Sequence, residues 1–297
     1  MILLLPESRN MASARIAVIG GSGLYEMPGL INKEEAILAT PFGSPSDSMV
    51  IGELEGISIV FLPRHGRGHQ LNPTEVPSKA NIYALKSLGV QQVISISAVG
   101  SLQESIHPLE MVVPDQLIDR TYGRPSTFFE DGIVAHVNFA EPFCPVMRSL
   151  LIEVLNTTES VVHDGGTYVV IEGPSFSTIA ESKLYRSWDA SIIGMTALPE
   201  AKLAREAELC YATLACVTDY DVWHDTHGVV TVEMVMANLQ HNVLVAQEMI
   251  RNIVTRLPSH RTCGCSTALS NAVITSPDAM TGSTKEHLKL FLENRVN

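Results

Sequence analysis

Residues 15–24, RIAVIGGSGL, join a short apolar run to a glycine-rich turn. The run predicts a buried strand over residues 15–18, and the turn lets backbone N–H groups approach an anion. Dinucleotide binding is not favoured, because the turn lacks the G-x-G-x-x-G spacing and no acidic residue closes the second strand about twenty positions later. The stretch therefore predicts an α/β fold whose first strand ends at an anion site.

The rest of the chain repeats this alternation of strand and helix patterns. Further strand-like runs cover residues 57–62, 92–97, 111–113, 167–171, 192–195 and 210–218. Helical patterns cover residues 80–88, 144–155, 179–188, 199–208 and 232–253. We expect one α/β domain with a central sheet over residues 14–257. Residues 258–297 are expected to form an extension that packs on the domain or on a neighbouring subunit, with a loose tail as the alternative.

The composition limits the partners of the chain. It has 297 residues and a net charge of -12 with no basic tract, which argues against nucleic acid and membranes but allows a local basic pocket. No stretch predicts a secretion signal or a membrane span. Five cysteines, an odd count, favour the cytoplasm. Cys263-Gly264-Cys265 permits a strained disulfide or a redox pair, although two unrelated thiols are favoured.

Hydroxyl, guanidinium and imidazole groups follow several predicted strands: Ser22, Arg64, His65, Ser97 and Thr196. Ligands of open α/β sheets bind beyond the strand ends, and Arg with hydroxyl donors suits phosphate. Each residue alone has an ordinary explanation, such as turn chemistry for Ser22 or a solvated loop for Arg64 and His65. Their joint placement predicts a phosphate site.

Asp219 and Asp221 follow the strand predicted over residues 210–218 and are the most specific feature. If the loop brings them together, a protonated carboxyl can donate to purine N7 while a carboxylate accepts from an exocyclic amino group. An N-cap followed by a surface acid is an equally open alternative from the spacing alone. The H-x-x-H at residues 224–227 has no third ligand cluster, so a loop histidine pair is favoured over a metal site.

Ordered motifs along the chain resemble the S-methyl-5'-thioadenosine phosphorylases of the trimeric purine nucleoside phosphorylase superfamily. They are IGGSGL at 19–24, RHG at 64–66, ANIYALK at 80–86, DQLIDRT at 115–121, AEPFCP at 140–145, IEGPSFS at 171–177, GMT at 194–196 and TDYDVW at 218–223. The resemblance implies a mixed, partly barrel-like central sheet and a homotrimer. It implies a pentosyltransferase that converts S-methyl-5'-thioadenosine and phosphate to adenine and 5-methylthioribose 1-phosphate, in methionine and purine salvage, with no metal or organic cofactor.

The resemblance also assigns roles to individual residues. It implies phosphate binding by Ser22, Arg64, His65, Ser97, Ala98 and Thr196. It implies base and ribose binding by Ala98, Phe176, Met195, Asp219 and Asp221, with Asp219 as the catalytic acid. It implies a 5'-group pocket of Val232, Met236 and, from a neighbouring subunit, His136, with a tail residue near Ile274 as a further candidate. Val232 and Met236 share one helix face, which ordinarily packs in the core.

Three alternative functions remain open from the sequence. A 6-oxopurine phosphorylase is the nearest, and it would need a donor to O6 in place of an acceptor. A nucleosidase would use water instead of phosphate. A non-catalytic module would bind the nucleoside without consuming it. A comparison of 6-amino and 6-oxo nucleosides with and without phosphate separates all three.

Overall fold

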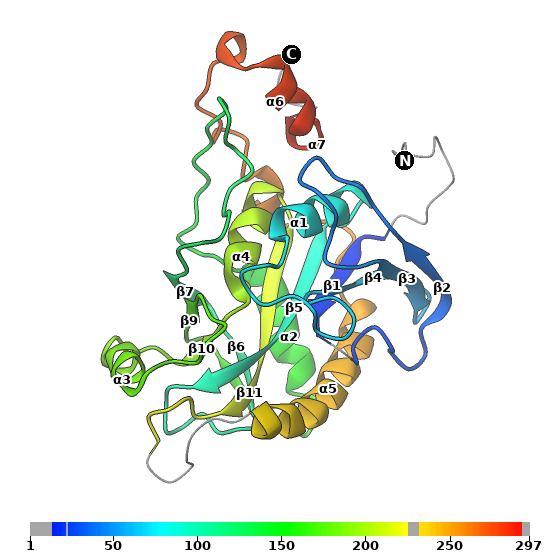
Figure 1. Cartoon of the computed structure of the whole chain (residues 1–297). Coiled ribbons are helices and arrows are strands. Elements are labelled where there is room, and N and C mark those ends of the chain that lie inside the picture. The colour runs from blue at the N-terminus through cyan, green and yellow to red at the C-terminus, as the bar shows by residue number, and fades with distance from the viewer. Residues whose placement is uncertain (1–13, 22, 225–231, 293–297) are drawn as a thin grey trace.

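The computed structural model describes residues 14–21, 23–224 and 232–292, and it shows the expected α/β domain with a mixed central sheet flanked by helices (Figure 1). The strands are β1 (Ile16–Gly20), β2 (Ile31–Ala36), β3 (Met49–Leu54), β4 (Ile57–Pro63), β5 (Gln92–Ser101), β6 (Met111–Val113), β7 (Gln116–Arg120), β8 (Val162–Asp164), β9 (Thr167–Ile171), β10 (Ile192–Gly194) and β11 (Cys210–Asp219). The helices are α1 (Ser78–Ser87), α2 (Pro145–Leu155), α3 (Ile179–Ser187), α4 (Ala197–Glu206), α5 (Val232–Val254), α6 (Gly282–His287) and α7 (Lys289–Leu292), with short 3-10 turns η1 (Gly264–Thr267) and η2 (Pro277–Ala279).

Strand β5 is the centre of the sheet because it pairs with three other strands. One edge pairs in parallel with β11 along most of its length. The other edge pairs in parallel with β1 as far as Ser95 and antiparallel with β10 from Gly100. Among the described strands, residues 96–99 therefore have no neighbour on that edge, and the sheet opens there.

The sequences of β5 and β11 explain their central place. They read QVISISAVGS and CYATLACVTD, with β-branched and small residues and a single charged residue, Asp219, at the end of β11. Every residue of β11 is buried. Strands covered on both faces need such continuous apolar runs rather than alternation.

Two apolar layers enclose the sheet. Helices α1 and α4 pack together over one face, where Ile82 and Leu203 join the larger core cluster. Helices α2 and α5 pack together over the other face, where Leu151 and Ile250 are fully buried. Within the described ranges, every helix is too short or too polar to serve as a membrane span.

Four strands, β2, β3, β7 and β8, are not predicted by the sequence patterns. β2 and β7 are the two ends of the main strand order. β2 has the sequence INKEEA with its first five residues exposed, and β7 has the sequence QLIDR with three exposed. Edge strands tend to be short and charged, which prevents pairing with other molecules but also removes the apolar alternation that marks a strand.

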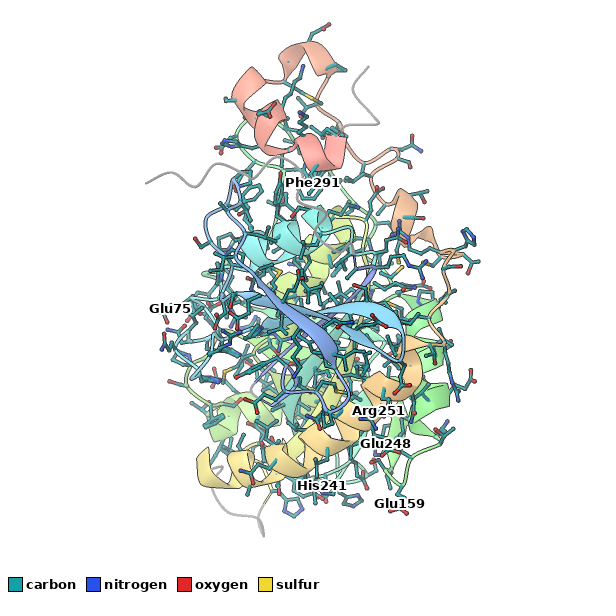
Figure 2. The ribbon with its side chains drawn as sticks, turned by 90° about the vertical axis from the view of Figure 1, so that its right-hand side faces the viewer. Glu75, Glu159, His241, Glu248, Arg251 and Phe291 are labelled. Atoms are coloured by element: carbon teal, nitrogen blue, oxygen red, sulfur yellow. The ribbon has the colours of Figure 1, made fainter. Side chains whose placement is uncertain are left out.

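The extension after residue 257 packs on the domain in this chain. Phe291 of α7, labelled in Figure 2, contacts two aromatic rings of the domain. They are the rings of Tyr83 and Phe128. Farther back in the extension, residues 272–274 lie beside residues 134–136, joined by the bridge between Ala135 and Val273. Leu269, Met280 and Leu288 are also buried in the core cluster of the domain.

Arg64 and Glu200 form an ion pair inside the domain, with exposed fractions of 3% and 1%. The Arg64 Nε donates to Glu200 at 2.5 Å. Its terminal nitrogens donate to the Ser95 hydroxyl at 2.7 Å and the Ile96 carbonyl at 2.8 Å. The Tyr211 hydroxyl donates to Glu200 at 3.0 Å. Each charge therefore has a counter-charge and further hydrogen bonds, as a buried ion pair requires.

Replacing Glu200 with alanine should lower the free energy of unfolding by about 3–5 kcal/mol, because Arg64 would remain buried without a counter-charge. Urea denaturation followed by circular dichroism measures the change. Lys202→Ala is the control, since Lys202 pairs with Asp119 near the surface, and such pairs contribute about 0–1 kcal/mol. Equal losses in the two variants would contradict a special role for the buried pair.

Candidate active site

One pocket collects most of the residues that the sequence predicts to bind phosphate, base and ribose. It lies beside the open edge of β5 and is bordered by α5 and by the ends of β10 and β11. Its lining includes Arg64, His65, Ser97, Ala98, Phe176, Met195, Thr196, Asp219 and Asp221. Phe176 is 46% exposed and so lies at the mouth of the pocket.

Hydroxyl and guanidinium donors gather at one end of this pocket. The Ser97 and Thr196 hydroxyl oxygens are 2.8 Å apart, and because one proton suffices for that bond, the other hydroxyl proton is left for a ligand. Among the described residues, Nη1 of Arg64 donates only to the Ile96 carbonyl, which leaves its second N–H for a ligand. These donors can bind an anion even though Glu200 balances the Arg64 charge.

His65 lies beside these donors and is neutral. Burial and the adjacent Arg64 charge lower the pKa of His65 to about 4. Its Nδ1 is 2.9 Å from the Leu71 carbonyl, so the ring proton resides there and Nε2 is an acceptor. The ring stacks on His69 with centroids 4.4 Å apart. An acceptor at Nε2 matches the P–OH of hydrogenphosphate.

Asp219, at the end of β11, has a buried carboxyl suited to holding a proton. Burial, reinforced by the charge of Asp221, raises the pKa of Asp219 above its ordinary value. The Thr218 hydroxyl lies 2.7 Å from Asp219 Oδ2 and 3.2 Å from the Val99 carbonyl. Without a ligand, the protonated form of Asp219 is also satisfied, because Oδ2 can donate to the Thr218 hydroxyl while that hydroxyl donates to the Val99 carbonyl.

Asp221 presents a buried carboxylate oxygen that has no well-aligned donor among the described residues. Within the described ranges its buried Oδ2 accepts no well-aligned hydrogen bond, but the Ser182 and Ser177 hydroxyls lie near the carboxyl group and act to lower its pKa. Burial raises the pKa of Asp221. The backbone turns sharply here, with φ of 51°. An unsatisfied buried acceptor costs free energy, so this atom suits a ligand that brings a donor, such as an amino group.

Gly100 allows the Asp219 carboxyl group and the Asp221 backbone to lie close to β5. A Cβ at this position would be 2.7 Å from Asp219 Oδ1 and 3.2 Å from the Asp221 nitrogen. The register of β11 against β5 shifts between Val217 and Asp219, at the level of Gly100. The glycine and the irregularity in the strand together position the acidic pair.

Neighbouring side chains hold the acidic segment in place. Asn238 of α5 donates to the Thr218 carbonyl at 2.7 Å. Trp223, just after the pair, donates to the Ser101 carbonyl at 2.8 Å, and the Arg186 guanidinium lies 3.4 Å from the centre of its ring. The segment is therefore anchored to α5, to β5 and to α3, which keeps both carboxyl groups in a fixed geometry.

Some predicted residues are not placed in this pocket. Ser22 and the side chains of Val232 and Met236 lie outside the described residues. His136 is exposed and lines a second hollow together with Cys265. Their assignments remain predictions. The described side chains of α5 that line the main pocket are Val235, Leu239, Asn242 and Val243.

The sequence patterns do not identify Glu200 or Asn242 as parts of the site. Glu200 is the counter-charge of Arg64, and the only signal for it is an acid amid the apolar positions at the start of a helix. Asn242 is fully buried and donates to the Val217 carbonyl at 3.0 Å, while its Oδ1 has no partner among the described side chains. The only sequence signal for Asn242 is an amide residue among the apolar positions of α5.

Comparison with known proteins gives one consistent family. Residues 15–255 match the model of the phosphorylase superfamily. The S-methyl-5'-thioadenosine phosphorylase of Thermosynechococcus vestitus is 56% identical over 284 residues, covering 94% of this chain and 98% of that protein. That of Geobacter sulfurreducens is 52% identical, covering 95% of this chain and 99% of that protein.

Solved structures agree with the sequences. A methylthioadenosine phosphorylase from an antarctic soil metagenomic library superposes with a TM-score of 0.90 at 51% identity, covering 94% of this chain and 99% of the other. The Schistosoma mansoni methylthioadenosine phosphorylase in complex with adenine gives a TM-score of 0.79 at 33% identity, covering 95% and 99%. The chain therefore belongs to the phosphorylase superfamily and, within it, to the S-methyl-5'-thioadenosine phosphorylases.

Proposed function

We propose that the chain catalyses the phosphorolysis of S-methyl-5'-thioadenosine to adenine and 5-methylthioribose 1-phosphate, as a step of methionine and purine salvage. One observation carries this proposal. A single pocket combines anion donors with two buried carboxyl groups, of which Asp219 can hold a proton and Asp221 has, among the described residues, one oxygen with no well-aligned donor. The names of relatives that span nearly the whole chain support the same reaction.

Hydrogenphosphate binds at the end of the pocket that carries Arg64, Ser97 and Thr196. The free guanidinium N–H and hydroxyl proton donate to phosphate oxygens, while the P–OH donates to His65 Nε2. The backbone around Ala98 lies along the open edge of β5, within reach of the same ligand. These contacts orient the nucleophile without requiring a net positive pocket.

The purine binds at the acidic end. The 6-amino group donates to Asp221 Oδ2, and protonated Asp219 donates to N7. A phosphate oxygen bonds to C1' as the C1'–N9 bond breaks, and the electron pair of that bond passes to the purine. The proton of Asp219 goes to N7. Hydrogenphosphate releases its proton to solvent as its oxygen bonds to C1', and Asp219 takes up a proton from solvent, so the protons balance. Neutralising charge on the departing base is the main catalytic task.

Asp219→Asn should lower turnover by about 10²–10⁴-fold, because the amide can donate a hydrogen bond but no proton. In the wild type, the acid is protonated below its raised pKa, so kcat should fall as pH rises through that value. The variant should lose this fall. Adenine release at saturating substrate across pH measures both effects, with Asp164→Asn, an exposed acid, as the control. Turnover within tenfold of wild type would overturn the assignment.

A substrate panel tests the reaction and the role of Asp221. Wild-type enzyme should cleave methylthioadenosine and, less well, adenosine, and only with phosphate; inosine and methylthioinosine should be poor substrates. Asp221→Asn should lower kcat/KM for the 6-amino nucleosides by about 10–100-fold and narrow their advantage over the 6-oxo nucleosides, because an amide N–H can donate to O6. Cleavage without phosphate would identify a nucleosidase, and binding without cleavage a non-catalytic module.

We also propose a homotrimer in which each chain completes the 5' pocket of a neighbour. His136 and Ile274 lie in the two adjacent stretches 134–136 and 272–274, and both are exposed, Ile274 to 63%. Neither lines the main pocket of its own chain. Phe176 at the pocket mouth and the α3 residues Ile179 and Leu184 that follow it in sequence are apolar side chains that are 45–58% exposed, which suits a covered surface.

His136→Ala should raise KM for methylthioadenosine by about tenfold, which corresponds to about 1.4 kcal/mol of lost binding, and leave KM for phosphate nearly unchanged. Initial-rate kinetics measure both constants, and sedimentation velocity gives the number of subunits. Ile37→Ala is the control, since Ile37 is 83% exposed and outside the pocket lining. A monomer with wild-type activity would contradict the shared pocket.

The proposed reaction needs no cofactor, because it involves no redox change and Asp219 supplies the proton. We propose the cytoplasm as the site of action. None of the five cysteines is joined in a disulfide, which is typical of a reducing compartment.

A further inference from the structure

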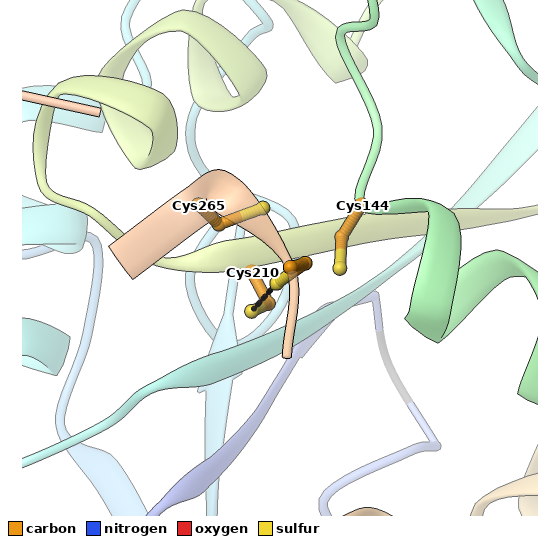
Figure 3. Close-up of side chains that lie close together, drawn as sticks. Cys144, Cys210 and Cys265 are labelled. Atoms are coloured by element: carbon orange, nitrogen blue, oxygen red, sulfur yellow. Dashed lines mark hydrogen bonds between the residues drawn. The ribbon is translucent and has the colours of Figure 1, made fainter. Parts of the chain in front are cut away.

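Four of the five cysteines meet in one cluster outside the active site. The Sγ atoms of Cys144, Cys210, Cys263 and Cys265 all lie within 4.8 Å of one another. Figure 3 shows Cys144, Cys210 and Cys265 converging from three different segments. Cys210 and Cys263 are 3.3 Å apart, in hydrogen-bond contact. The fifth, Cys216, instead borders the active-site pocket.

These thiols come from distant parts of the sequence. Cys144 is the N-cap of α2, Cys210 begins β11, and Cys263 and Cys265 flank Gly264 in the extension. Three of the four are buried and Cys263 is partly exposed. A buried cysteine often serves as a small apolar side chain, but that role does not bring four sulfur atoms together. The C-x-C alone favoured two unrelated thiols, and the fold changes that interpretation.

The spacing suits a tetrahedral metal centre. With Zn–S bonds of about 2.3 Å, the sulfur atoms of a tetrathiolate site lie roughly 3.8 Å apart. Sulfur atoms that are all within 4.8 Å of one another reach this arrangement by shifts of about 1 Å or less. The partly exposed Cys263 gives the ion a path of entry.

We propose that Cys144, Cys210, Cys263 and Cys265 bind one Zn²⁺ as a structural tetrathiolate site. The four thiols lose up to four protons on binding. The four thiolates and Zn²⁺ together then carry a net charge of -2. The N-terminus of α2, capped by Cys144, favours negative charge at this position. None of the four residues lines the active-site pocket, so the ion has no part in phosphorolysis.

The ion fastens the extension to the domain. Cys263 and Cys265 belong to the extension, whereas Cys144 and Cys210 belong to the two elements α2 and β11 of the core. Residues 272–274 follow within the same extension. Zinc binding therefore stabilises the placement of that segment, and its loss should lower the melting temperature of the whole chain.

Metal content tests the proposal directly. The full chain, produced in a reducing cytoplasm and purified with a reducing agent and no chelator, should contain about one zinc per chain by inductively coupled plasma mass spectrometry. Cys265→Ser should reduce the zinc content at least tenfold, in line with removal of a ligand. Cys216→Ala removes a thiol outside the cluster and should keep the zinc.

Two further measurements apply if Cys265→Ser fails to fold. Wild-type protein exchanged into Co²⁺ should show the intense visible bands of tetrahedral cobalt thiolate. A chelator should lower the melting temperature of reduced wild-type protein and of Cys216→Ala alike, and added Zn²⁺ should restore it. Zinc below a tenth of an equivalent after reconstitution under reducing conditions would overturn the proposal. So would equal zinc in Cys265→Ser and wild type, or disulfides joining these four cysteines in the freshly isolated protein.

Discussion

On one of its two edges, strand β5 pairs with two strands in succession instead of one, and the active site depends on the break between them. It pairs with β1 up to Ser95 and with β10 from Gly100, so four residues between them face a gap in the sheet. β11 stays paired on the other edge and carries Asp219 to the same level. The gap thus brings Arg64 and Ser97, from the first half of the chain, beside the carboxyl groups of Asp219 and Asp221 from the second half.

The polar groups in this gap differ in how many hydrogen-bond and charge partners they have. These differences suit them to different roles. Arg64 and Glu200 compensate each other almost fully, so they give the pocket rigidity and one remaining donor rather than net charge. Asp219 has partners for both its protonation states, which allows it to gain and lose a proton without losing its position. Among the described residues, Asp221 keeps one buried oxygen without a well-aligned partner, and on the proposed reaction this oxygen accepts from the amino group of the base.

The sequence predicts the buried elements and the main pocket well, for a physical reason. Central strands such as β11 are apolar throughout, and residues that follow them in sequence share one edge of the sheet, so Ser97, Thr196 and Asp219 could be placed together in advance. Edge strands such as β2 carry no such pattern. Glu200 and the four-cysteine cluster depend on contacts between segments far apart in the chain, which spacing alone does not reveal.

The fixed tautomer of His65 has a consequence for anion selectivity. Because Nδ1 donates to Leu71, Nε2 offers only a lone pair to an anion bound at the proposed phosphate site. Hydrogenphosphate can meet it with a hydroxyl, but sulfate, of nearly the same size and charge, has no proton at neutral pH and would place oxygen lone pairs against nitrogen. The low pKa of His65 opposes the protonation that would relieve this repulsion. The proposed phosphate site would thus distinguish two tetrahedral dianions by a single hydrogen atom.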